Sequence, residues 1–264
     1  MAWVVRLALA IVLLGYAAFC AVFVAALEQA GARIEAAQAE LAVPPPGPAA
    51  RLRVEGRMLV VPSWRRLEPG QLWAYAGPKQ SISEEFIPSL TEIALPKPAW
   101  LADHRLQPQA ATALQHWAAT AQQAGRPFIV TSAYRSALSQ RQLEQALIAA
   151  HGPQYAQRFA ARPGHSEHQL GLAVDLSRFT PACQKAFAHC WLDEATAAWL
   201  AVTAPDHGFI LRYPPGKQHI TGVAPESWHF RYVGREMAHF IRDSGLTFDE
   251  VIWHLQAERQ RLAQ

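Results

Sequence analysis

The chain has 264 residues, more than the roughly 100–200 of a typical single domain. Apolar residues make up 51% of it and charged residues 17%, which excludes a disordered or collagen-like chain, and three cysteines are too few for a small disulfide-framework protein. The net charge of +3 comes from 24 basic and 21 acidic residues spread along the chain, so no nucleic-acid partner is predicted. One sizeable globular core with appendages is expected.

The first feature along the chain is an uncharged apolar segment from Leu7 to Leu27, preceded by Arg6. At about 1.5 Å per residue, a helix of this length crosses a hydrocarbon core of about 30 Å. Signal peptides have shorter apolar stretches, of about 7–15 residues, so residues 1–27 are predicted to be a membrane anchor, with cleavage near Ala26 as the alternative. Because basic residues favour the cytoplasmic side, we expect a single-pass protein of the cytoplasmic membrane whose main domain faces the periplasm or the cell exterior.

A helix-prone stretch rich in Ala, Glu and Gln follows, and the Pro-Pro-Pro-Gly-Pro run at residues 44–48 ends it. Such proline-rich runs are semi-rigid spacers, so residues 28–50 are predicted to be a stalk and linker. Residues 51–99 contain short apolar pieces broken by Pro and Gly, which indicates an N-terminal extension with no assigned role. Residues 100–264 are predicted to form the catalytic domain.

Helical periods and short strands alternate in this domain. Helices are predicted over 110–124, 139–151, 194–201, 235–243 and 247–263, strands over 128–132, 171–176 and 209–213, and a hairpin-like pair over 218–222 and 228–233. Their mixed order has no regular βαβ rhythm and no internal repeat. The order therefore predicts an α+β fold, with a small antiparallel sheet and flanking helices.

Two of the cysteines, Cys183 and Cys190, lie seven positions apart in this domain. In an oxidising compartment a disulfide that closes a short loop is favoured. Two buried thiols, or a metal pair with His189, are the alternatives.

Two segments concentrate side chains that can bind metal beside turn residues. The first places His168 in a loop and Asp175 on the apolar strand that follows, where a buried carboxylate is costly unless it is paired or coordinated. The second places His229 on a strand, three residues after Glu226. Two imidazoles and one carboxylate form a catalytic zinc set with an open fourth position, and a further carboxylate can accept a proton from water.

The residue pattern of these segments resembles that of the zinc D-alanyl-D-alanine carboxypeptidases of the VanY type, in the lysostaphin/D-Ala-D-Ala/hedgehog metallopeptidase superfamily. Four motifs in the family's order, over roughly residues 100–255, carry the resemblance: Tyr134-Arg135-Ser136 with Gln140; Ser166, His168, Gly171, Ala173 and Asp175; Gly208 to Pro214; and Glu226, Trp228 and His229. Leu170 and Ser227 stand where Thr and Pro are common in the family, and neither is a ligand. The expected fold is therefore hedgehog/DD-peptidase-like.

The resemblance implies one zinc ion per chain, held by His168, Asp175 and His229. It also implies that Glu226 is the general base, which takes a proton from water and later returns it to the leaving amine. The substrate class it implies is the peptidoglycan stem peptide.

Three further side chains are implied as contacts of that substrate. Arg135 would act in catalysis and hold the substrate's carbonyl or terminal carboxylate, because a planar guanidinium suits bidentate contact; its alternative is a surface ion pair. Ser166 would donate or accept a hydrogen bond, with capping of a turn as the alternative. Gln140 would contribute to binding, or orient Arg135.

The predicted activity is removal of the terminal D-alanine from stem peptides. Two sister activities use the same zinc site: an L,D-carboxypeptidase acting on a shorter stem, and an endopeptidase acting on cross-links. A catalytically silent cell-wall-binding protein is the alternative from another class. Retention of Glu226 argues against it, because a binding module has no need of a general base beside a ligand.

Overall fold

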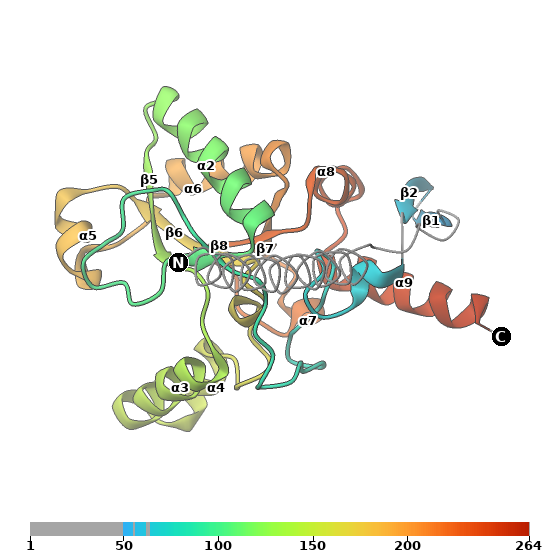
Figure 1. Ribbon diagram of the computed structural model, residues 1–264, viewed down its shortest axis with the longest axis horizontal. Coiled ribbons are helices and arrows are strands. Elements are labelled where there is room, and N and C mark those ends of the chain that lie inside the picture. Colours follow the sequence, from blue (N-terminus) through green and yellow to red (C-terminus); the bar gives the residue numbers. More distant parts are fainter. Residues whose placement is uncertain (1–49, 55, 62–63, 264) are drawn as a thin grey trace, which may run out of the picture. The chain divides into compact units, whose positions relative to one another are not determined.

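The computed structural model describes residues 50–263, except residues 55, 62 and 63 (Figure 1). The predicted membrane anchor and the stalk up to residue 49 lie outside the described residues. Within the described part of the chain, no helix is both long and apolar enough to cross a membrane.

The fold is α+β, in agreement with the prediction. A four-stranded antiparallel sheet with the strand order β5-β6-β8-β7 lies at its centre. Its strands are β5 (Phe128–Ser132), β6 (Ala173–Arg178), β7 (Phe209–Tyr213) and β8 (Glu226–Tyr232). Two further antiparallel pairs are β1 (Ala50–Val54) with β2 (Arg57–Val61), and β3 (Thr91–Glu92) with β4 (Arg105–Leu106).

The five longer predicted helices are present, with ends that differ by a few residues. The α-helices are α2 (Pro108–Gln123), α3 (Ala137–His151), α4 (Pro153–Phe159), α5 (Pro181–Lys185), α6 (Glu194–Thr203), α7 (Gln218–Thr221), α8 (Arg235–Ser244) and α9 (Phe248–Leu262). The 3-10 helices are η1 (Trp64–Leu67), η2 (Glu167–Leu170), η3 (Phe187–His189) and η4 (Ala204–His207).

The predicted hairpin between residues 218–222 and 228–233 is wrong. The first of these segments is the short helix α7, which ends at Gly222 with φ of 72°, a left-handed conformation that glycine adopts at little cost. The second segment, β8, pairs instead with β6 and β7. Its partners come from distant parts of the chain, which a local pattern cannot reveal.

Alternation along the strands gives the central sheet an apolar and a polar face, because successive side chains point to opposite sides. On the apolar face, Val174 and Leu211 both lie opposite Phe230. This face packs in one core with α2 and α6, which are also joined by the hydrogen bond from the Trp117 indole to Thr203 Oγ1, of 3.0 Å. Figure 1 shows these two helices together, apart from the adjoining α3 and α4.

On the polar face, Asp175 of β6 lies opposite Ser132 of β5 and opposite His229 of β8. Arg231 follows on the same face, two positions further along β8. The strand register therefore brings the polar residues of three strands together in one row.

Residues 51–99, predicted to be an N-terminal extension of unknown role, contribute buried side chains to the core. Trp73 and Tyr75 lie in a second apolar cluster with residues of α8 and α9. The Trp73 indole donates a hydrogen bond of 3.0 Å to the carbonyl of Val233. The described residues belong to one compact unit, Ala49–Gln264.

Cys183 and Cys190 are joined by a disulfide, as the sequence favoured. The bridge links α5 to the residue after η3, beside Trp100, whose indole donates a hydrogen bond of 2.7 Å to the Cys183 carbonyl. The two alternatives, buried thiols and a metal pair with His189, therefore do not apply.

Candidate metal centre

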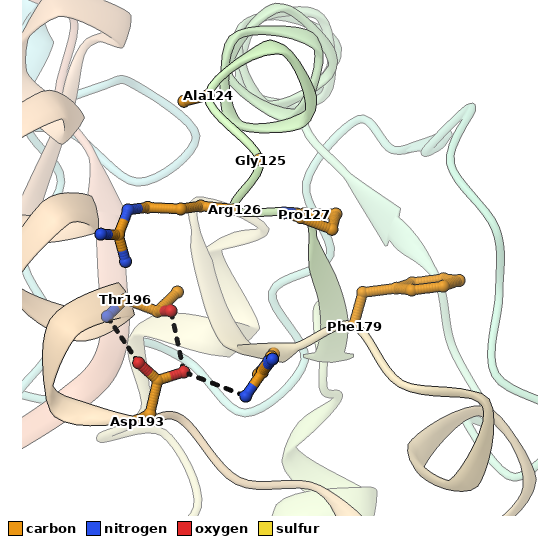
Figure 2. A pocket seen from close by; sticks show the side chains of 8 residues that line it. Ala124, Gly125, Arg126, Pro127, Phe179, Asp193 and Thr196 are labelled. Atoms are coloured by element: carbon orange, nitrogen blue, oxygen red, sulfur yellow. Dashed lines mark hydrogen bonds and ion pairs between the residues drawn. The ribbon is translucent and has the colours of Figure 1, made fainter.

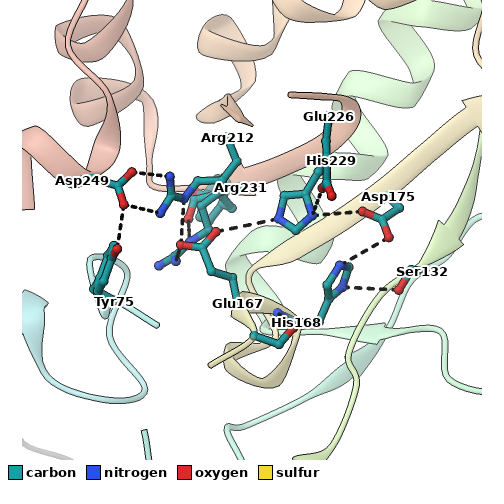
Figure 3. Close-up of polar contacts among 12 residues, drawn as sticks. Tyr75, Ser132, Glu167, His168, Asp175, Arg212, Glu226, His229, Arg231 and Asp249 are labelled. Carbon is teal, nitrogen blue, oxygen red and sulfur yellow. Dashed lines mark hydrogen bonds and ion pairs between the residues drawn. The ribbon is translucent and has the colours of Figure 1, made fainter. Parts of the chain in front are cut away.

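Three predicted ligands, His168, Asp175 and His229, converge on the polar face of the sheet (Figure 3). One potential ligand atom of each lies within 4.8 Å of the others. His168 Nε2 is 3.4 Å from Asp175 Oδ2, and His229 Nδ1 is 3.1 Å from Asp175 Oδ1. The structure thus assembles the predicted set from η2, β6 and β8.

The short helix η2 holds His168 in place. Ser166 begins it, and its hydroxyl accepts a hydrogen bond of 3.3 Å from the backbone amide of His168. Gly171 ends it with φ of 66°, and a Cβ added there would lie 2.8 Å from a methyl group of Leu90. The His168 carbonyl in turn accepts a hydrogen bond from the backbone amide of Arg135. The Ser166 hydroxyl thus caps the turn that carries His168.

The surroundings of the three side chains fit a metal ion. A histidine that binds metal uses one ring nitrogen and usually donates the other N–H to a carbonyl or carboxylate. The Nδ1 of His168 is 2.6 Å from the carbonyl of Ala133, and the Nε2 of His229 faces Glu167 Oε2 at 3.8 Å. Asp175 Oδ1 is buried without a hydrogen bond of acceptable geometry in the described part of the chain. Two nitrogens and a carboxylate are a donor set that suits catalytic zinc.

Charge and burial set the protonation of these groups. Burial alone would raise the pKa of Asp175, but the imidazoles of His168 and His229 outweigh it and lower this pKa well below its usual range. Burial would lower the pKa of His229, but the carboxylates of Asp175, Glu167 and Glu226 raise it to about 9. Because a histidine must be neutral to bind a metal, metal binding would be linked to proton release.

Glu226, the predicted general base, begins β8 at the edge of this cluster. Its Oε2 is 3.5 Å from His229 Nδ1, and 17% of its side chain is exposed. Burial raises the pKa of Glu226, which favours the proton-accepting role of a general base near neutral pH. The carboxylate lies beside the ligand set and remains accessible from solvent.

Arg135 lies between β5 and α3, with Nη2 at 3.9 Å from Asp175 Oδ2. Its guanidinium donates hydrogen bonds of 2.9 Å to Ser132 Oγ and to Gln140 Oε1. Gln140 is 1% exposed and donates a further hydrogen bond, of 2.7 Å, to the carbonyl of Ala161. Gln140 therefore contacts Arg135 directly, as the alternative of orienting that side chain requires.

Glu167, Arg212 and Arg231 were not predicted as site residues, although both arginines contact Glu167 directly behind His229. Arg212 stands within the otherwise apolar strand β7, and a charge in such a strand usually signals a buried partner. Glu167 lies next to His168, within the motif from Ser166 to Asp175. The neighbouring residues in the sequence give no sign that Glu167 is buried.

A separate surface pocket lies at the far ends of β5 and β6 (Figure 2). Asp193, on its wall, accepts hydrogen bonds of 2.9 and 2.8 Å from the amide and hydroxyl of Thr196, and lies 4.0 Å from Arg178. These contacts cap α6. The length of β5, roughly 13 Å at 3.3 Å per residue, separates the pocket from Ser132, so it is not part of the metal centre.

The family model of VanY, D-alanyl-D-alanine carboxypeptidase, matches residues 103–235. The chain belongs to the VanY family. The matched segment contains all seven predicted site residues: Arg135, Gln140, Ser166, His168, Asp175, Glu226 and His229.

Curated relatives of this chain come from Enterococcus and Bacillus species. The bifunctional D-Ala-D-Ala dipeptidase and carboxypeptidase VanXYC of Enterococcus gallinarum is 38% identical over 117 residues, 44% of this chain and 62% of that protein. The putative carboxypeptidase YodJ of Bacillus subtilis is 31% identical over 189 residues, 69% of this chain and 67% of that protein. A D-alanyl-D-alanine carboxypeptidase of Enterococcus faecalis is 38% identical over 133 residues, 47% of each chain. The alignments thus span about half to two thirds of these relatives.

Solved structures of similar proteins include a metal complex. A VanY D,D-pentapeptidase mutant from a VanB-type resistance cassette, in complex with Zn(II), has a TM-score of 0.57 and 30% identity, and the alignment covers 68% of this chain and 98% of that one. VanYB in complex with D-alanine-D-alanine has the same TM-score and identity, with 68% and 96% covered. The LdcB LD-carboxypeptidase has a TM-score of 0.61 and 27% identity, with 78% and 94% covered.

Proposed function

We propose that the protein is a zinc-dependent D-alanyl-D-alanine carboxypeptidase, which removes the terminal D-alanine from peptidoglycan stem peptides. The observation that carries this proposal is the cluster of His168, Asp175 and His229 with Glu226 at 3.5 Å from one of its ligand atoms. The relatives that bind Zn(II) and D-alanine-D-alanine support it.

The three clustered side chains would hold the metal, and neighbouring residues would transfer the proton and bind the substrate. When bound, zinc acts as a Lewis acid and makes water a nucleophile at neutral pH. Glu226 takes the proton of the attacking water and returns it to the leaving amine. Arg135, held by Ser132 and Gln140, presents a fixed guanidinium that suits a substrate carboxylate.

The proposed activity is tested with a Lys-D-Ala-D-Ala peptide and the purified full chain. We expect release of D-alanine, loss of release after treatment with a chelator, and recovery when zinc is restored. Because three ligands with an open position bind one ion, metal analysis should find about one zinc per chain and almost none in the His168→Ala/Asp175→Ala double variant. Wild-type protein without stoichiometric metal, or a double variant that retains it, would contradict the ligand assignment.

The structural likeness to LdcB keeps the L,D-carboxypeptidase as a second candidate. The same assay with a tetrapeptide stem separates the two, since only the second activity removes the single terminal D-alanine of that stem. Cleavage of the tetrapeptide without cleavage of Lys-D-Ala-D-Ala would replace the proposed substrate and keep the zinc chemistry. Digests of cross-linked muropeptides, analysed by mass spectrometry, report endopeptidase activity.

We also propose that residues 1–27 anchor the protein in the cytoplasmic membrane, with the catalytic domain facing the periplasm or the cell exterior. The length of the uncharged segment after Arg6 supports this arrangement. A phosphatase reporter fused after Gln264 should be active and remain in the membrane fraction. Activity found wholly in the soluble fraction, with a new N-terminus near Ala26, would instead identify a cleaved signal peptide.

A further inference from the structure

A cluster of four charged side chains lies directly behind His229, and none of the four is exposed. This buried charge cluster consists of Glu167 of η2, Arg212 of β7, Arg231 of β8 and Asp249 of α9. Arg212 and Arg231 donate hydrogen bonds of 3.0 and 2.9 Å to the same oxygen of Glu167, Oε1. Arg212 also donates to both oxygens of Asp249, at 2.5 and 3.2 Å. Two positive and two negative groups balance each other.

The cluster extends beyond the segment that the VanY family model matches. The Tyr75 hydroxyl donates a hydrogen bond of 2.6 Å to Asp249 Oδ1. Arg231 donates to the carbonyls of Leu72 and Ala74, at 2.9 and 2.7 Å. The matched segment ends at residue 235 and begins at residue 103, so the cluster ties a segment before it and a helix after it to the metal centre.

One oxygen of the cluster is left without a partner, and it points at a metal ligand. Glu167 Oε2 and His229 Nε2 are both buried, and neither has a hydrogen-bond partner in the described part of the chain. They face each other at 3.8 Å (Figure 3). A shift of under about 1 Å would bring them to hydrogen-bonding distance. The other ring nitrogen, Nδ1, faces Asp175 and Glu226.

We propose that Glu167 is a positioning residue, which accepts the Nε2–H of His229 and so leaves the Nδ1 lone pair directed into the metal centre. This inference rests on the proposed function, because it requires His229 to bind a metal. Both guanidinium groups donate to Oε1 of Glu167, so its other oxygen, Oε2, is available to accept a hydrogen bond from His229. A neutral imidazole has one N–H, so an acceptor at Nε2 selects the tautomer that binds through Nδ1.

Residues outside the matched segment take part in this positioning. Tyr75 is hydrogen-bonded to Asp249, Asp249 to Arg212, and Arg212 to Glu167. The segment that includes Tyr75, which had no assigned role in the sequence, and the start of α9 therefore support the orientation of a metal ligand. A cluster that only joined chain segments would stabilise the fold without affecting His229.

The test is the variant Glu167→Gln in the full chain, measured first by zinc affinity in competition with a chromogenic chelator. The amide is isosteric and keeps an acceptor for the arginines, but its NH₂ can face His229 Nε2, where it donates and does not accept. We expect zinc affinity to fall by about 10–100-fold, the usual effect of losing such a partner. Tyr75→Phe removes only the hydroxyl bond to Asp249, and a smaller fall in the same direction is expected.

A second readout reports the tautomer directly. In zinc-loaded wild type labelled with ¹⁵N-histidine, we expect His229 to carry its proton on Nε2, and we expect this signal to be shifted or lost in Glu167→Gln. The matched control is Leu255→Ala, which removes a fully buried side chain of α9 from the apolar core. It should lower the thermal midpoint while zinc affinity and the His229 signal stay those of the wild type.

The outcomes separate this inference from the proposed function. Wild-type zinc affinity and an unchanged His229 signal in Glu167→Gln would overturn the inference alone. A loss of affinity no greater than that of Leu255→Ala would also overturn it and leave the cluster a purely structural one. Wild-type protein that binds no zinc would overturn both, whereas one that binds zinc but releases no D-alanine would overturn only the proposed substrate. If Glu167→Gln does not fold, an affinity of Tyr75→Phe equal to that of the wild type overturns the inference.

Discussion

Glu226→Gln is expected to slow the release of D-alanine by about 10²–10⁴-fold, the usual loss for a positioned general acid/base. This corresponds to about 3–5 kcal/mol of transition-state stabilisation. The amide is isosteric with the carboxylate, but it cannot accept a proton from water. Because Glu226 is not one of the three clustered ligands, zinc content and the thermal midpoint should stay those of the wild type.

Two further variants serve as controls for this result. His229→Ala removes a ligand and should abolish both metal binding and activity. Arg135→Ala should weaken capture of a free terminal carboxylate, seen as a higher KM, while zinc content is unchanged. Release of D-alanine from Lys-D-Ala-D-Ala and zinc content are measured on the same samples. A Glu226→Gln protein as fast as the wild type would show that the proton is handled elsewhere.

Arg212→Met should lower the free energy of unfolding by about 3–5 kcal/mol, because removing one member of a buried ion pair leaves its partners desolvated and uncompensated. Arg212 has no exposed surface and is the residue that contacts both carboxylates of the buried charge cluster, Glu167 and Asp249. Replacement by a side chain of similar volume removes the charge with little change in packing. Urea unfolding, followed by circular dichroism, should give a lower midpoint with an unchanged slope.

The matched control is the same substitution at an exposed arginine. Arg242 is 45% exposed, with contacts to Asp243 at 2.8 Å and to Asp206 at 3.6 Å. Exposed pairs of this kind contribute about 0–1 kcal/mol, so Arg242→Met should shift the unfolding midpoint only slightly. Equal shifts for the two variants would mean that the buried cluster contributes no more to stability than a surface ion pair.

Local patterns in the sequence predicted the longer helices and most strands of the central sheet, and short motifs predicted the three side chains that converge in the structure. The strands at residues 128–132 and 209–213 agree with the structure residue for residue, because apolar runs bounded by Gly, Pro or a turn depend on neighbours in the chain. His168, Asp175 and His229 were found because short motifs resembling a known family contain them. The α+β class followed from the order of these elements.

Only the tertiary structure decided which strands pair and which charges are buried. The error at residues 218–222 arose because β8 takes its partners from distant strands. The contact between Gln140 and Arg135 became evident only in the structure. The reason is that the burial of Gln140 depends on packing around α3 and on the carbonyl of Ala161. Tyr75 and Asp249 are 174 residues apart in the chain yet 2.6 Å apart in space. No periodicity in the sequence encodes such a contact. The free-energy cost of burying a charge is offset only when the folded chain brings a partner to it. The proposed support of His229 by Glu167 and the arginines is therefore a property of the fold.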